Sequence, residues 1–312
     1  MTLQQTFLAV LGALVVLFST ATAYGSWRAG HTIDVARQAW IAQLNTRIRA
    51  AWAIVVLFTI AFAVGQAALV VVFALASFFA LREMIALTPT RPSDHWALVL
   101  AFYVVIPVQY VLVASDRYGL FTVFIPVYVF LVLPVVVALR HDTERFLERV
   151  AKVQWGLMIS VYCVSHAPAI ATLEPAHFEG RGPLLLLYFL LIVQMFDLFA
   201  VFASAAVGRT PLASNPSKSR EGVLLGAAAA LLLGTALWWM TPFTWWQSAL
   251  MAAVVIGAAF LGGLVLDSVK RSLGARTWAG EIQLSRGVLE RLEGLIFAAP
   301  VFFHITLFFF AT

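Results

Sequence analysis

The sequence predicts an all-α fold, a polytopic bundle of about ten transmembrane helices. Of the 312 residues, 62% are hydrophobic and 11% are charged, whereas a soluble domain has about 45–50% apolar and about 25% charged residues. The apolar residues are gathered in runs close to the roughly 20 residues that a spanning helix needs. These observations exclude a soluble enzyme, a disordered chain and a nucleic-acid-binding domain.

The apolar runs give the expected order of membrane spans. Only Gly65 and Gln66 separate the short second run from the third, so these two runs could form one broken helix. The first run follows Gln4 and Gln5 without the basic residues of a signal peptide, so we expect a retained helix. The expected spans are residues 4–24, 51–64, 66–84, 96–115, 119–139, 153–172, 183–206, 222–240, 246–266 and 294–311.

We expect a single integral membrane domain over residues 1–312. Its N-terminal helical part covers about 1–180, and its C-terminal part, about 181–312, carries the candidate chemistry. The polar segment 25–50 is expected to form an amphipathic interfacial helix. Its apolar residues recur at helical spacing: Ile33, Ala36, Trp40, Ile41 and Leu44. Cys163 is the single cysteine, which excludes an intrachain disulfide and a cysteine-based zinc site.

The basic residues predict the orientation. If the segment 25–50 is cytoplasmic and the spans alternate, all but two of the 20 Lys and Arg residues face the cytoplasm. The two outside are Arg117 and Arg181. Because cytoplasmic loops are enriched in Lys and Arg, we expect both termini to face outward. This bias accounts for most of the formal net charge of +5 without an anionic partner.

Asp197 is the clearest ionisable residue inside an apolar run, LIVQMFDLFAVF. A carboxylate within a membrane span is costly and marks a candidate functional site. The alternative is a structural carboxylate paired with a basic loop residue.

The next loop, GRTPLASNPSKSREG, spans residues 208–222. Lys218 and Ser219 lie directly before an apolar helix, whose free N–H groups and dipole favour a phosphate. Lys and hydroxyl groups add hydrogen bonds to phosphate oxygens. A cytoplasmic basic loop whose serine caps the helix explains the pattern equally well.

A second polar loop covers residues 267–295. Asp267, Lys270 and Arg271 share one helical face, and Glu290 and Glu293 are three residues apart. Carboxylates that bind magnesium, beside cations that bind phosphate, are the groups a nucleotide-phosphate reaction needs. Ordinary ion pairs of these glutamates with Arg286 remain the alternative.

These loops resemble the phosphatidate cytidylyltransferase (CDP-diacylglycerol synthase) family. On its motif S-P-x-K-T-x-E-G, Lys218, Glu221 and Gly222 match, and Ser219 takes the threonine position. On its C-terminal signature the matching residues are Lys270, Arg271, Gly274, Gly287, Leu289 and Arg291. Arg276 keeps the charge of a lysine, and Glu290 and Glu293 replace aspartates. Similarity to a proteobacterial branch extends to FFALREMIALTPTR, WGLMISVYCVSHAPA and FAAPVFFH.

The resemblance implies a reaction of CTP with phosphatidate, or a related lipid phosphate, that gives CDP-diacylglycerol and pyrophosphate. It implies Mg²⁺, with a second cation as an option, and a homodimer in the bacterial inner membrane. The implied catalytic and phosphate-binding residues are Asp197, Lys218, Lys270, Arg271, Arg276 and Arg291. The implied substrate-binding residues are Arg209, Ser217, Ser219, Glu221 and Gly222. The implied metal ligands are Asp267, Glu290 and Glu293.

Some signature positions differ. Thr277 replaces an aspartate, and residues 284–287 read Leu-Ser-Arg-Gly where the family has Gly-His-Gly-Gly. Two alternatives therefore stay open: a catalytically degenerate paralogue that acts as a binding or regulatory membrane protein, and a related nucleotide-dependent lipid kinase.

Overall fold

The structure is a computed structural model. It describes residues 3–31, 38, 41, 45, 48–49, 52, 55–56, 59–212, 218–275, 278 and 287–311. In this part the regular elements are helices, with one isolated antiparallel bridge between Pro211 and Ser219 and no β-sheet, so the predicted all-α polytopic fold is confirmed. The chain divides into two compact units, Met1–Leu69 and Val70–Thr312. The division into two parts near residue 180 stays a prediction.

The first unit contains helix α1 (Leu3–His31) and a helical stretch at residues 59–64. The Phe7 and Phe62 rings stack with centroids 3.7 Å apart. Gly65 has a φ of +115°, which L side chains rarely adopt. It separates the stretch from α3 (Gln66–Ala86), so the second and third apolar runs form two helices. More than half of the segment 25–50, where an interfacial helix is predicted, lies outside the described residues, and its residues 25–31 belong to α1. Of the second expected span, residues 52, 55, 56 and 59–64 are described and helical.

In the second unit, three long helices each contain a π-helical segment. They are α4–η2–α5 (His95–Leu100, Ala101–Val105, Ile106–Ala114), α6–η3–α7 (Tyr118–Val123, Phe124–Val129, Phe130–Ala138) and α8–η4–α9 (Phe146–Leu157, Met158–Cys163, Val164–Ile170). Proline lies within or after each π segment, at positions 107, 126 and 168. Because proline lacks the N–H that an α-helix needs, the helix widens locally.

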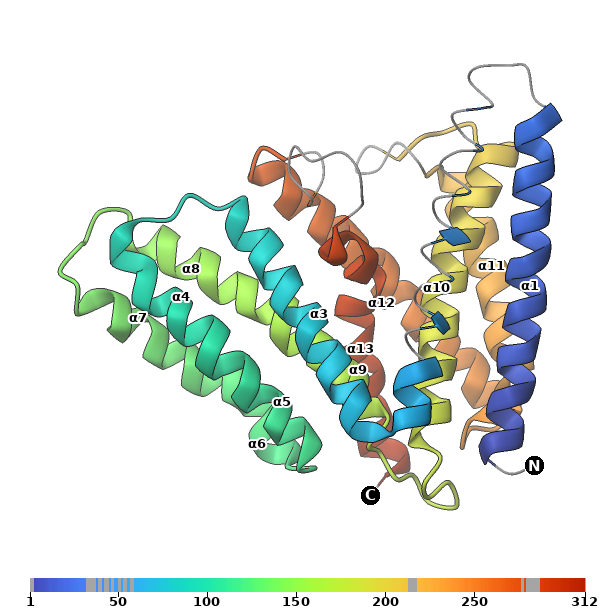
Figure 1. The fold of residues 1–312 in the computed structure, drawn as a ribbon, viewed down its shortest axis with the longest axis horizontal. Coiled ribbons are helices and arrows are strands. Elements are labelled where there is room, and N and C mark those ends of the chain that lie inside the picture. Colours follow the sequence, from blue (N-terminus) through green and yellow to red (C-terminus); the bar gives the residue numbers. More distant parts are fainter. Residues whose placement is uncertain are drawn as a thin grey trace. The chain divides into compact units, whose positions relative to one another are not determined.

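The remaining helices are α10 (Gly182–Val207), α11 (Arg220–Ala236), α12 (Trp245–Ser272) and α13 (Val288–Phe310), with a short 3₁₀ turn, η5 (Trp238–Met240). Within this unit α10 packs along α11, and α12 packs along α13 and α11 (Figure 1). The end of α10 meets the start of α11 where the Ser204 hydroxyl accepts the N–H of Ser219, and the end of α12 meets the start of α13 where Lys270 pairs with Glu293.

Six described helices are long and apolar enough to cross a membrane. They are Gln66–Ala86, Pro92–Ala114, Tyr118–Ala138, Gly182–Val207, Trp245–Ser272 and Val288–Phe310, and they correspond to six of the expected spans. The expected span 222–240 is shorter than predicted, because α11 has 17 residues, about 26 Å of helix. In α1 the apolar described part is Gln5–Val16. The expected span 153–172 lies in α8–η4–α9, which is not among the six.

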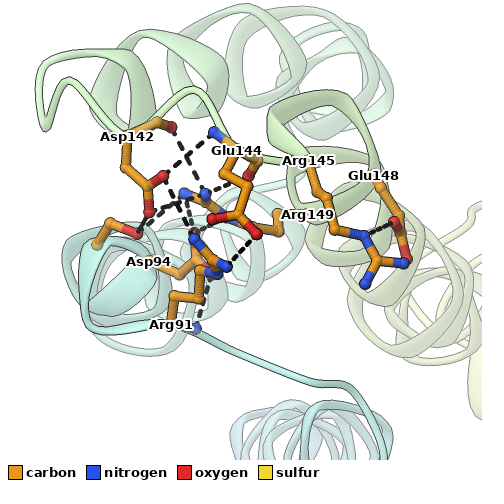
Figure 2. A network of polar contacts seen from close by, with 8 residues as sticks. Arg91, Asp94, Asp142, Glu144, Arg145, Glu148 and Arg149 are labelled. Carbon is orange, nitrogen blue, oxygen red and sulfur yellow. Dashed lines mark hydrogen bonds and ion pairs between the residues drawn. The ribbon is translucent and has the colours of Figure 1, made fainter.

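A network of charged residues ties the loop before α4 to the loop before α8 (Figure 2). The Arg149 guanidinium, 6% exposed, lies 2.9 Å from Asp94 Oδ1 and 3.0 Å from Asp142 Oδ2. It also donates to the backbone oxygen of Glu144 at 2.7 Å, while Arg91 contacts Asp142 and Glu144. A buried arginine with several acceptors fixes these loops more firmly than exposed ion pairs would.

Candidate functional site

The two ends of the loop between α10 and α11 pair through backbone hydrogen bonds, so the loop forms a small hairpin. The backbone N–H of Leu212 donates to Lys218 at 2.9 Å, and that of Arg220 donates to Thr210 at 3.0 Å. The tip, residues 213–217, is outside the described residues, and the predicted substrate residue Ser217 lies there. The paired backbone gives Lys218 and Ser219 defined positions at the start of α11.

Two side chains hold this hairpin against the helix. Ser219 is the N-cap of α11, and its Oγ accepts the N–H of Gly222 at 3.0 Å. The Glu221 carboxylate accepts the N–H groups of Arg209 and Thr210 and the Thr210 hydroxyl, at 2.9–3.2 Å. The hydrogen bond from its own N–H, together with these bonds from Arg209 and Thr210, lowers the pKa of Glu221 to about 2.

Gly222 lets α11 approach α10 closely. A Cβ at this position would overlap the Ser204 hydroxyl and lie 2.7 Å from the Ala200 oxygen. The same Ser204 hydroxyl accepts the N–H of Ser219 at 2.8 Å. Three of the predicted substrate-binding residues, Ser219, Glu221 and Gly222, therefore shape the loop through intramolecular contacts. Arg209 contributes its backbone to the same arrangement.

Asp197 and Lys218, both candidates from the sequence, are brought together. Lys218 Nζ lies 2.6 Å from Asp197 Oδ1, and their side chains are 21% and 46% exposed. The carboxylate within the apolar run is thus neutralised by the following loop. This contact is the one expected from the structural alternative considered above, in which a basic loop residue pairs with Asp197.

A second charged group joins the end of α12 to the start of α13. Lys270 Nζ lies 2.9 Å from Asp267 Oδ1 and 3.3 Å from Glu293 Oε1. The indole N–H of Trp278 donates to the same Glu293 oxygen at 3.1 Å. The side chains of Lys270, Asp267 and Glu293 are 9%, 8% and 17% exposed, and Trp278 is buried. We call these four residues the Lys270 cluster.

Glycines place the helices that carry both groups. A Cβ on Gly262 of α12 would lie 2.7 Å from the Phe297 Cβ of α13. A Cβ on Gly294 would lie 3.0 Å from Val193 of α10. Asp197 follows Val193 by one turn on the same face, and Glu293 precedes Gly294. The Asp197–Lys218 pair and the Lys270 cluster therefore lie at the same end of the α10–α13 bundle.

Glu83 is a site residue that the sequence did not reveal. From α3 its two carboxylate oxygens accept the N–H groups of Val288 and Leu289 at the start of α13, both at 2.8 Å. A Cβ on Gly287 would lie 2.5 Å from a Glu83 oxygen, so a larger residue there would force the Glu83 carboxylate to move. The carboxylate satisfies free N–H groups and complements the helix dipole. Glu83 lies in the segment FFALREMIALTPTR that shares the family resemblance, but nothing in that segment indicates a contact with the start of α13.

The other predicted residues lie around the Lys270 cluster or outside the described residues. Arg271 and Arg291 are exposed near the Lys270 cluster in sequence, on the last turn of α12 and the first turns of α13. Glu290 is half-buried one turn before Glu293. Arg276 lies outside the described residues, as do Arg286 and most of the α12–α13 loop.

The carboxylates do not form a ready magnesium site. Among the described residues, no three His, Cys, Asp or Glu side chains come together in a way that could hold a metal ion. The expected group of Asp267, Glu290 and Glu293 is therefore not assembled. Two of these carboxylates instead share the ammonium group of Lys270. In this arrangement a protein cation already engages both carboxylates, and the role of Asp267, Glu290 and Glu293 as ligands of Mg²⁺ stays a prediction.

Comparison with known proteins places the chain in a family. Residues 45–309 match the cytidylyltransferase family. The chain is 32% identical to the uncharacterized protein YnbB of Escherichia coli (strain K12) over 304 residues, which covers 95% of this chain and 96% of that protein.

Relatives named phosphatidate cytidylyltransferase match a smaller region. A phosphatidate cytidylyltransferase of Helicobacter pylori (strain J99) is 28% identical over 42% of this chain and 50% of the enzyme. That of Synechocystis sp. (strain PCC 6803) is 29% identical over 35% of this chain and 38% of the enzyme. These enzymes are thus matched over half of their length or less. The family match, in contrast, spans most of the chain, and this integral membrane protein belongs to the cytidylyltransferase family.

Proposed function

We propose that the protein transfers the cytidylyl group of CTP to phosphatidate, giving CDP-diacylglycerol and pyrophosphate. One observation carries the proposal. In a chain of the cytidylyltransferase family, two lysines, Lys218 from the loop before α11 and Lys270 from the last turn of α12, lie at one end of the α10–α13 bundle, and each pairs with a carboxylate. Phosphatidate cytidylyltransferases are among the relatives, and a phosphate-bearing lipid suits a site built on membrane helices.

The chemistry requires little proton transfer. An oxygen of the lipid phosphate attacks the α-phosphorus of CTP, the bond to the bridging oxygen of the β-phosphate breaks, and pyrophosphate leaves with that electron pair. The lipid phosphate is already ionised near neutral pH, so a strong general base is unnecessary. The main barrier is the meeting of two anions, which fixed cations lower.

The described residues suggest a division of roles. When the substrates bind, Lys218 and Lys270 give up part of their contacts with carboxylates and bind phosphate oxygens of the substrates. Asp197 orients Lys218. The exposed arginines add positive charge around the phosphates: Arg271, Arg291 and, by its place in the sequence, Arg276. Ser219, Glu221, Gly222 and the Arg209 backbone position the hairpin that presents Lys218, with Ser217 at its tip.

Magnesium enters this proposal as the counter-ion of the CTP triphosphate, where its remaining ligands come from phosphate oxygens and water. The site faces the cytoplasm of the bacterial inner membrane, where CTP is available, and both termini face outward. We propose that the protein assembles as a homodimer in the membrane.

The test is cytidylyl transfer by the purified full-length protein in lipid nanodiscs, with labelled CTP, phosphatidate and Mg²⁺. We expect lipid-dependent pyrophosphate release, which Lys218→Ala and Glu293→Ala lower by roughly 10²–10³-fold. Lys152→Ala is the matched control, because Lys152 pairs with Glu148 on α8, away from both lysine groups, and should keep the wild-type rate.

Product analysis separates the alternatives. A nucleoside diphosphate together with a newly phosphorylated lipid would instead indicate a lipid kinase. A well-folded protein that binds CTP but releases no pyrophosphate would overturn the transferase proposal in favour of a binding or regulatory protein.

A further inference from the structure

The ammonium group of Lys270 occupies the position of a cation. Carboxylate oxygens from two helices approach it, Asp267 from α12 at 2.9 Å and Glu293 from α13 at 3.3 Å. On another side, the centroid of the Trp278 ring is 5.9 Å from Nζ. Oxygen ligands from facing helices and low exposure are the surroundings that a bound metal ion would have.

The charge of the cluster explains why a cation is needed there. Two carboxylates that share a buried site repel each other, and an isolated buried charge is costly. Lys270 compensates one negative charge and contacts both groups. The Trp278 indole N–H supplies a further donor to Glu293. The pair of helices therefore meets around a covalently attached cation.

We infer that Lys270 is the resident cation of the Asp267–Glu293 pair, in place of a metal ion, and that its removal opens a site for one divalent cation. This inference concerns the structure of the cluster and holds whether or not the protein turns over CTP. It predicts that the wild-type protein has no divalent-cation affinity at this position in the absence of nucleotide.

The experiment measures metal binding without nucleotide. Mn²⁺ is titrated into the EDTA-treated full chain in nanodiscs of zwitterionic lipid, and bound Mn²⁺ is counted by electron paramagnetic resonance. We expect Lys270→Met to gain one Mn²⁺ at least about tenfold tighter than any wild-type binding. Mg²⁺ alone should raise the Tm of Lys270→Met and leave that of the wild type unchanged.

Matched variants locate the new ion. Lys218→Met also removes a lysine that pairs with a carboxylate, but Asp197 is the one carboxylate in that ion pair, so no Mn²⁺ should be gained. The double variant Lys270→Met/Asp267→Asn keeps the formal charge of the cluster and should also gain none. Sensitised Tb³⁺ luminescence in Lys270→Met should disappear when Trp278→Phe is added.

Two results would overturn the inference. The first is Mn²⁺ binding to the wild type that equals binding to Lys270→Met and is lost in Glu293→Gln. The second is a folded Lys270→Met that gains no Mn²⁺. If Lys270→Met folds poorly, the test uses the wild type. The fluorescence of Trp278 is obtained by subtracting the spectrum of Trp278→Phe from that of the wild type. This fluorescence should not change when Mg²⁺ is added. A saturable response would overturn the inference, and a flat titration supports it.

Discussion

At the scale of single residues, the carboxylates near the bundle end have two kinds of partner. Glu221 and Glu83 accept backbone N–H groups, and so they set the course of the chain. Asp197, Asp267 and Glu293 instead contact lysine ammonium groups. The first kind acts on geometry whether or not a ligand is bound, whereas the second can exchange partners with a phosphate.

Glu221 gives the clearest pH prediction. Its pKa of about 2 in the folded protein lies below the ordinary value of 4.5. Its contribution to the hairpin is therefore complete above about pH 4.5 and is lost as the pH falls through about 2. A ¹³C NMR titration of the Glu221 carboxyl group measures this directly. In Thr210→Ala, which removes the hydroxyl donor at 2.9 Å, the pKa should rise toward its ordinary value; equal titration near pH 4.5 in both proteins would contradict the hairpin geometry.

The sequence supplied many site residues but few of their partners. It placed Asp267 and Lys270 on one helical face, and the ion pair between them follows from that spacing. The contact of Lys270 with Glu293 depends on how α12 and α13 pack, which local spacing does not determine. Glu83 was missed for a stronger reason: it caps a helix 205 residues further along the chain, and no local pattern encodes such a contact.

At the scale of elements, two features hold the helices of the second unit in place: the close contacts within the α10–α13 bundle and the loops before α4 and α8 that Arg149 joins. Apolar runs were sufficient to predict the long helices, since burial in lipid requires them. They did not predict the π-helical segments, which arise where proline removes an N–H within a run that stays apolar. Nor did they predict the end of α11 at Ala236, because the following Leu237 and Trp238 continue the apolar run.

The charged network of Figure 2 gives a stability prediction for these elements. Arg149→Met leaves the buried Asp94 carboxylate, 4% exposed, without its guanidinium. We expect the free energy of unfolding to fall by about 3–5 kcal/mol, measured by equilibrium unfolding in mixed micelles of SDS. Arg145→Met is the control, because Arg145 is 67% exposed and pairs with Glu148, and it should cost under about 1 kcal/mol. Equal effects of the two substitutions would show that the network adds no stability.

At the scale of the whole molecule, the distribution of basic residues predicts the orientation. In a Cys163→Ala background, Glu174→Cys should react with a membrane-impermeant maleimide in intact cells, because the loop before α10 is expected outside. Arg145→Cys should react only after permeabilisation, because its loop is expected in the cytoplasm. The reverse pattern would place the lysine groups on the outer face, away from CTP, and would contradict the proposed function as well.

The contact of Glu83 with α13 also bears on biosynthesis. The acid is translated early, in α3, whereas the N–H groups that it accepts belong to α13. Until α13 has left the ribosome and entered the membrane, Glu83 lacks these partners and the Lys270 cluster lacks Glu293. The bundle end that carries the lysines is thus completed late, so an incomplete chain in the membrane would expose an unpaired carboxylate to quality-control proteases rather than carry out partial chemistry.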